Sequence, residues 1–296
     1  ADLAYEMAED EVFLRIVRTL VVDGYMDARG HTSALLEQLN RAINLVRDGG
    51  DTYQEIAHFL IGKRGNAYRE RGDLENALRC YQEAVDLAAI LGMYDRQVVG
   101  LCAISSIYSN TERFVEANLA LDTAEDVINS EEVVDKYDAD DIKFMKAYYL
   151  HERGLFLTFA MGDFVAARES YAMEVALAKE LDESRLHCIG LVNLGTAEYM
   201  LEEFDSALEH LGEALDVANR NNNLIWRGMA YEALGETYHA MQEYPKAQTQ
   251  FNEALSAYKA SGVVSFLAKV MEYMQTQEQY VIPTEYLTYL DEQQSG

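Results

Sequence analysis

A small residue recurs at near-constant spacing through the middle of the chain. It is an alanine, found at intervals of 40, 50, 40 and 40 residues as Ala77, Ala117, Ala167, Ala207 and Ala247. A large apolar residue stands three positions before each alanine, and another stands four positions after it. This spacing places the three side chains on one face of a helix, and a fixed period of this size is typical of stacked helical repeats. The sequence therefore predicts an all-α solenoid.

Each copy of the pattern reads as two helices joined by a tight turn. In the fourth copy, Leu194 and Gly195 belong to the first helix, whereas Ala207 and Leu211 belong to the second. A glycine facing an alanine lets two helix backbones approach closely, and the larger neighbours fill the space around the contact. The chain has only two prolines, which favours long uninterrupted helices.

These motifs resemble the tetratricopeptide repeat (TPR). The Leu-Gly-x-x-Tyr motif of its first helix is matched by Leu234, Gly235 and Tyr238, and the Ala-x-x-x-Phe motif of its second by Ala247 and Phe251. The early Trp and late Pro of the family are absent, and the period is 40 residues rather than about 34. This longer form is similar to the repeats of LGN/Pins-type adaptors, kinesin light chains and bacterial signalling arrays. The resemblance implies a right-handed α-solenoid of stacked helix-turn-helix repeats with helical caps.

The chain divides into three parts on this basis. Residues 1–50 read as an N-terminal helical cap or degenerate repeat, residues 51–260 as five repeats, and residues 261–296 as C-terminal capping helices. Repeat arrays need atypical terminal units to cover their exposed end faces. An alternative for the C-terminus is that residues 280–294 fold back into the groove of the array as a built-in ligand.

The third repeat departs from the pattern in two ways. The interval before it is 50 residues instead of 40, and the additional residues fall around the acidic stretch 130–143. We expect a solvated extension there, because the stretch lacks the glycine and the closing glutamate of a calcium-binding loop. In addition, Gly154 and Leu157 fit the pattern only if the turn of this repeat is one residue longer.

Charge and cysteine content limit the classes of partner and compartment. The chain has 51 acidic and 24 basic residues, for a net charge of −27. Without clustered Lys and Arg to neutralise phosphates, a nucleic-acid partner is not expected, and no apolar run is long enough for a membrane span. The three cysteines are far apart, which favours reduced thiols and a cytoplasmic location. The N-terminus lacks the features of an export signal.

No arrangement of residues points to catalysis. The six histidines form no metal-spaced pair, and there is no HExxH motif, glycine-rich phosphate loop or nucleophile elbow. His151 takes the place of an apolar residue of the repeat, so we interpret it as a partly buried histidine with a satisfied ring. Glu202 and Glu203 fall in a turn and read as cap residues. We expect no enzymatic activity, no metal and no cofactor.

The resemblance implies that binding takes place in the concave groove, which the first helix of each repeat mainly lines. Helical spacing from the tyrosine-bearing face gives these groove candidates: Asn66, Arg69, Glu70, Ser106, Asn110, Phe159, Asn193, Tyr199, Glu232, Glu236 and His239. Asparagine suits a peptide backbone because its side chain both donates and accepts hydrogen bonds. The Lys and Asn clamp that the family uses for a C-terminal carboxylate is incomplete, since the second repeat has Cys102 and Ser106 where it would be needed.

Two functions remain open at this point. The first is a non-catalytic scaffold that binds a protein or peptide, basic or amphipathic because the groove becomes acidic toward the fifth repeat. The alternative is a ligand- or peptide-sensing regulatory domain of a bacterial signalling or transcription-regulating system. Residues 1–50 contain no basic recognition helix, so an effector unit would lie outside this chain. The sequence does not predict an oligomeric state.

Overall fold

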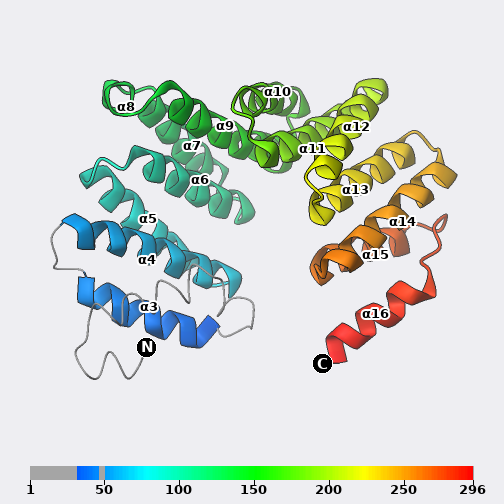
Figure 1. The fold of residues 1–296 in the computed structure, drawn as a ribbon, viewed down its shortest axis with the longest axis horizontal. Helices are drawn as coiled ribbons and strands as arrows, with labels where there is room; N and C mark the ends of the chain where they lie inside the picture. Colours follow the sequence, from blue (N-terminus) through cyan, green and yellow to red (C-terminus); the bar gives the residue numbers. More distant parts are fainter. Residues whose placement is uncertain (1–31, 47–50, 296) are drawn as a thin grey trace. The chain divides into compact units, whose positions relative to one another are not determined.

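The computed structural model describes residues 32–46 and 51–295. Within these ranges the chain is helical and has no strand. Contacts divide it into two units, residues 1–145 and 146–296, with the boundary inside one helix. In each unit, successive helices pack against one another in antiparallel pairs (Figure 1). The predicted all-α solenoid of stacked helix pairs is confirmed.

The helices of the first unit are α3 (Thr32–Val46), α4 (Asp51–Glu70), α5 (Leu74–Ile90), α6 (Tyr94–Asn110), α7 (Phe114–Ile128) and α8 (Glu131–Lys136). The boundary falls within α9 (Ala139–Leu155). The second unit continues with a π-helical turn (Phe156–Met161), α10 (Phe164–Glu180), α11 (Ser184–Met200), α12 (Phe204–Arg220), α13 (Leu224–Ala240), α14 (Tyr244–Ser261), α15 (Val264–Thr276) and α16 (Thr284–Ser295). None of the described helices combines the length and apolar character needed to cross a membrane.

The repeated alanines lie in the buried contacts between paired helices. All five are fully buried. A Cβ atom added to Gly195 would lie 2.6 Å from Cγ of Leu211, and one added to Gly235 would lie 2.5 Å from Cε1 of Phe251. Both distances are too short for non-bonded carbon atoms, so glycine is required at these positions by the large side chain of the opposite helix.

Most turns share one backbone conformation. Their second residue has a positive φ, and in five turns it is not a glycine: Glu112, Asp182, Glu202, Asn222 and Gln242. The amide of the next residue then closes the preceding helix, as in the bond from Glu203 N to Glu198 O at 2.9 Å. Helices therefore follow one another at steps of 20 residues through most of the array, for example from Phe204 to Leu224 to Tyr244.

Replacing Glu202 with glycine is expected to stabilise the protein by about 0.5–1 kcal/mol. Its φ of 62° is left-handed, which costs an L-residue about 1–2 kcal/mol, whereas the extra freedom of glycine in the unfolded chain costs about 0.5–1 kcal/mol. Calorimetric melting of Glu202→Gly should show a higher Tm. The control is Glu209→Gly, within α12, which should lower Tm because glycine disfavours helix interiors. A lower Tm for Glu202→Gly would contradict the argument.

The acidic insertion before the third repeat is anchored to the first unit. Its short helix α8 buries Val133 completely. The Tyr137 hydroxyl donates to Oδ1 of Asp95 at 2.9 Å, and Nζ of Lys136 donates to the carbonyl of Gly92 at 2.8 Å. The acidic side chains of this segment are all exposed, in agreement with the predicted solvated extension, while Val133 and Tyr137 hold the segment against the start of α6.

The additional residue of the third repeat lies in a helix and not in a turn. Residues Phe156–Met161 form the π-helical turn at the end of α9, and Gly162 then adopts the usual left-handed conformation. The amide of Asp163 bonds to the carbonyl of Leu157, six residues back, where the other turns bond five residues back. The predicted longer turn is wrong because a π-helical turn absorbs one residue within the helix. Phe159 lies on this turn with 78% of its surface exposed.

The two ends of the array differ in how much the structure describes. Of the cap predicted over residues 1–50, α3 is described and packs on α4 with Leu39 and Ile43 buried; residues 1–31 and 47–50 lie outside the described residues. At the other end, Tyr280 and Tyr286 join the core formed by α14 and α15. The capping role of both ends stays a prediction.

Candidate functional site

The groove candidates of the first unit lie on α4 and α6. Asn66 is tied to its own helix pair, because the hydroxyl of the buried Tyr81 donates to its Oδ1 at 2.6 Å. The other four are partly or fully exposed: Arg69, Glu70, Ser106 and Asn110. No hydrogen bond or ion pair joins the α4 candidates to those of α6 in the described part of the chain. Their role in binding stays a prediction.

The second unit brings several candidates together on its first helices. The Tyr199 hydroxyl on α11 donates to Oε2 of Glu236 on α13 at 3.1 Å. Glu232, one helical turn before Glu236, accepts from the Tyr258 hydroxyl at 2.8 Å and from Nζ of Lys269 on α15 at 3.0 Å. We call Tyr199, Glu232, Glu236 and Lys269 the first-helix cluster. It joins three consecutive first helices, and Lys269 is the member that the sequence interpretation missed.

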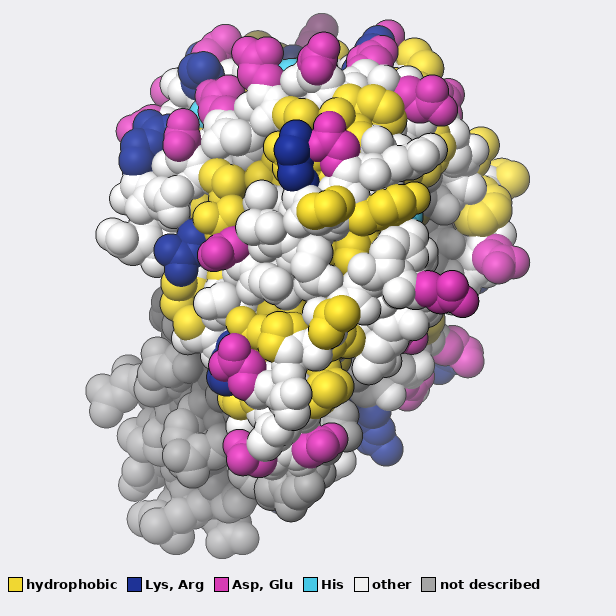
Figure 2. Space-filling view, turned by 90° about the vertical axis from the view of Figure 1, so that its right-hand side faces the viewer, with side chains coloured by type: hydrophobic (Ala, Val, Ile, Leu, Met, Phe, Trp, Pro, Cys, Tyr) yellow, Lys and Arg dark blue, Asp and Glu magenta, His cyan; other side chains and the backbone are white. Residues whose placement is uncertain are grey.

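Burial and neighbouring charge set the protonation of this cluster. Burial raises the pKa of Glu236, and the nearby Glu232 carboxylate raises it further. Burial opposes the charge of Lys269, but the Glu232 carboxylate prevails and the pKa of Lys269 is raised. Lys269 therefore neutralises part of the acidity that the sequence predicted for this region. On the face shown in Figure 2, acidic side chains are scattered among hydrophobic and neutral ones.

Three further candidates have different surroundings. Nδ1 of His239 lies 2.6 Å from the Tyr280 hydroxyl, so the segment that leads to α16 contacts a predicted groove residue. Nδ2 of Asn193 is buried and has no hydrogen-bond partner among the described residues. Phe159, on the π-helical turn, is the most exposed aromatic candidate.

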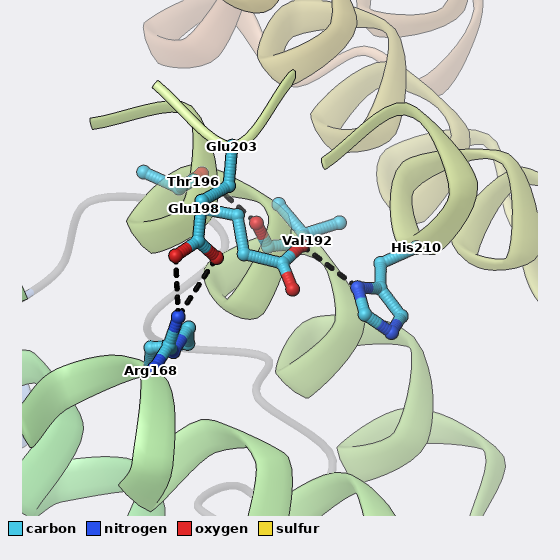
Figure 3. Close-up of polar contacts among 6 residues, drawn as sticks. All are labelled: Arg168, Val192, Thr196, Glu198, Glu203 and His210. Carbon is cyan, nitrogen blue, oxygen red and sulfur yellow. Dashed lines mark hydrogen bonds and ion pairs between the residues drawn. The ribbon is translucent and has the colours of Figure 1, made fainter. Parts of the chain in front are cut away.

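A polar pair that the sequence interpretation missed lies between α11 and α12. Glu198 is only 4% exposed, and its Oε2 lies 2.7 Å from Nδ1 of His210 (Figure 3). Burial raises the pKa of Glu198, and the contact with His210 opposes that shift. The signal was present in the sequence, because Glu198 stands where other repeats have a tyrosine, such as Tyr68 and Tyr238.

A second missed pair connects α10 to the turn before α12. Nη1 of Arg168 donates to both carboxylate oxygens of Glu203, at 2.6 and 2.8 Å (Figure 3). Glu203 occupies the N-cap position of α12, but its side chain makes no capping hydrogen bond. Glu203 is therefore a cap residue by position, as predicted, but its side chain forms an ion pair between repeats instead of a capping bond, and Glu202 supplies the left-handed turn residue.

These two pairs border a cavity of about 430 Å³ that we call the α10–α12 pocket. Leu194 and Glu198 of α11 are buried and form its floor, and Ala172 and Ala176 of α10 are exposed at its rim. The remaining lining residues are Arg168, Glu169, Val175, Glu203 and His210. The pocket therefore combines apolar walls with a buried carboxylate at its floor.

Comparisons with known proteins agree with the fold and its repeats. Models of the tetratricopeptide repeat match residues 60–90 and residues 187–260. No curated protein sequence is significantly similar to the chain.

Several solved structures share the architecture. BtubC (BKLC) from P. vanneervenii has a TM-score of 0.62 and 17% identity, over 78% of this chain and 92% of that one. The STAND protein with a tetratricopeptide repeat sensor from Pyrococcus horikoshii has a TM-score of 0.60 and 15% identity, over 90% and 42%. A Rap protein complexed with Competence and Sporulation Factor has a TM-score of 0.57 and 13% identity, over 91% and 74%. At such low sequence identity, these similarities show a shared fold and nothing more about function.

Proposed function

Because this chain is a tetratricopeptide repeat protein, we propose that it is an interaction scaffold that binds a protein or peptide segment along the first helices of its repeats. One observation carries the proposal: side chains from consecutive first helices meet in the first-helix cluster, where Tyr199 of α11 bonds to Glu236 of α13. A segment crossing these helices would meet hydrogen-bond acceptors and one cation on neighbouring repeats. Such a surface suits a partner that is basic or amphipathic.

Exposed apolar side chains at the ends of the first helices complement the polar cluster. Phe159 on the π-helical turn and Met200 at the end of α11 are both exposed. Large aromatic side chains supply much of the binding energy in protein interfaces. We therefore propose that Phe159 anchors an apolar residue of the partner, while Glu232 holds a polar or basic one.

The test begins with peptides selected from a random phage-displayed library on the immobilised full chain. Fluorescence anisotropy then measures their affinity for variants. Phe159→Ala and Glu232→Gln are expected to weaken binding at least about tenfold, or by about 1.4 kcal/mol. Binding should also weaken as salt rises from about 50 to 500 mM, because salt screens exposed charges.

Matched controls lie on the second helices of the same unit. Met173→Ala removes an exposed apolar side chain of α10, and Glu209→Gln removes an exposed carboxylate of α12. Both should leave affinity unchanged. If the control variants weaken binding as much as Phe159→Ala and Glu232→Gln do, the first helices are not the binding surface.

A regulatory role is the second candidate, and the contact between His239 and Tyr280 favours it. A ligand that engages His239 would compete with the segment leading to α16, so binding would release that segment. The same selected peptides allow the distinction. Faster hydrogen exchange at residues 277–283 on peptide binding would support a sensing role. Unchanged exchange there would leave the scaffold function as the only candidate.

A further inference from the structure

We propose that the α10–α12 pocket binds the side chain of an arginine or lysine from a partner protein, at a site separate from the first-helix cluster. The pocket measures about 430 Å³, within the range of cavities that hold small ligands. It lies between the second helices of two consecutive repeats, with α11 beneath them. A single long side chain is therefore a suitable occupant.

The carboxylate of Glu198 supplies the recognition group. Its Oε2 contacts His210, and no hydrogen-bond partner of its Oε1 is found among the described residues. Figure 3 shows this second oxygen without any contact to the residues drawn. This oxygen is accessible from the pocket, and an incoming ammonium or guanidinium group would bind it with a charge-assisted hydrogen bond.

The charges around the pocket favour a cation. Three carboxylates, those of Glu169, Glu198 and Glu203, line it against the guanidinium of Arg168 and the imidazole of His210. Arg168 is already engaged with Glu203. An anionic ligand would have to approach the buried Glu198 carboxylate, which opposes it. The net charge of −27 on the whole chain also attracts basic partners from a distance.

The walls distinguish a long basic side chain from a bare ion. Ala172, Val175, Ala176 and Leu194 form an apolar passage from the rim to Glu198. Lysine and arginine bury their methylene groups along such surfaces while their charged ends find polar partners. A metal ion has no comparable fit, since the described residues contain no group of three side chains able to hold one.

The pocket and the first-helix cluster use different faces of α11. Leu194 and Glu198 are four residues apart and lie on one face, whereas Tyr199 is turned by about 100° from Glu198 around the helix axis. Leu194 and Glu198 belong to the pocket, and Tyr199 bonds to α13. A partner could therefore be held at both places, and each site can be disabled alone.

The experiment titrates the isotope-labelled full chain with the blocked tripeptide acetyl-Ala-Arg-Ala-amide and follows amide resonances of α10, α11 and α12 by NMR. The control peptide has citrulline, which matches arginine in shape but carries no charge, and a third peptide has lysine. We expect saturable shifts with a Kd in the millimolar range for arginine or lysine, and binding at least about tenfold weaker for citrulline.

Variants of the protein give an independent readout. Glu198→Gln keeps the shape and a hydrogen bond to His210 but removes the charge, so it should weaken arginine binding at least about tenfold. Glu209→Gln, an exposed site on α12 outside the pocket, removes the same charge and should have no effect. Glu232→Gln should also have no effect here, which separates this site from the proposed function. Equal binding of citrulline and arginine, or shifts that never saturate, would overturn the proposal even if Glu198→Gln failed to fold.

Discussion

Replacement of His151 by alanine is expected to lower the free energy of unfolding by about 3–5 kcal/mol. Nδ1 of His151 on α9 lies 3.1 Å from Oε1 of Glu174 on α10, and the Glu174 side chain is fully buried. Without the histidine, a buried carboxylate loses the partner that compensates for its removal from water. Urea unfolding of His151→Ala followed by circular dichroism measures the loss.

A double replacement tests whether the pair or the space it fills matters. Because the π-helical turn adds one residue after His151, Val192 and Ala214 of the next repeat stand where His151 and Glu174 stand here. The variant with both His151→Val and Glu174→Ala therefore introduces a combination that the chain already uses. It is expected to be as stable as the native protein or more so, because replacing a buried ion pair by apolar residues is often neutral or favourable. Equal destabilisation in His151→Ala and in the double variant would show that the unpaired Glu174 carboxylate is not the cause of the loss.

The same pair predicts a pH dependence of stability. Burial opposes the charge of His151, but the hydrogen bond and charge of Glu174 prevail, and the pKa of His151 is raised above 6.5. Glu152 raises it further, and Arg185 acts in the opposite direction. The folded protein then holds this proton more tightly than the unfolded chain does. The stabilisation is complete below about pH 6.5 and is lost as pH rises through the folded pKa. Tm should fall over this window less in the double variant than in the native protein.

Replacement of Gly235 by valine is expected to destabilise the protein by about 2–3 kcal/mol, because extra carbon atoms would be forced into a packed contact. A Cβ at Gly235 would lie 2.5 Å from Cε1 of Phe251. The Phe251 ring is 1% exposed and packs against the rings of Tyr273 and Tyr280, at centroid distances of 5.4 and 5.2 Å. It has no space into which to move. The measurement is Tm by calorimetry and the urea midpoint.

A second helical glycine provides a control of opposite sign. Gly212 lies within α12, and no atom lies within 4 Å of a Cβ placed there. Gly212→Ala should stabilise the protein by about 1 kcal/mol, since alanine favours the helix and meets no obstacle. If Gly235→Val leaves the Tm unchanged, the close contact between α13 and α14 does not limit what this position can hold.

The candidate site was only partly predictable from the sequence. Spacing identified Tyr199, Glu232 and Glu236 as residues of the first helices, and the structure joins them in one cluster. It did not indicate Lys269, whose partner Glu232 lies 37 positions earlier. Helical periodicity predicts which residues share a face of one helix, but a contact between helices also depends on their separation and on side-chain rotamers.

The α10–α12 pocket also could not be predicted from the sequence, although one of its residues stood out there. Glu198 is the charged residue at a position that is tyrosine in three other repeats and leucine in the remaining one, so the sequence marks it as unusual. Its surroundings are assembled from α10, α11 and α12, and Arg168 meets Glu203 across 35 positions of sequence. No local pattern predicts that these side chains line one open pocket, since a pocket is a property of how three helices pack.

The sequence by itself determined the repeat. Large and small apolar residues at spacings of three and four define helix faces, and the 40-residue period pairs those helices, because both effects act over short distances along the chain. The tertiary structure decided the rest. It placed the extra residue of the third repeat in a π-helical turn, it buried Glu174 beside His151, and it left the Glu198 carboxylate facing a pocket. Each of these outcomes depends on the space between helices, which the packing of distant side chains sets.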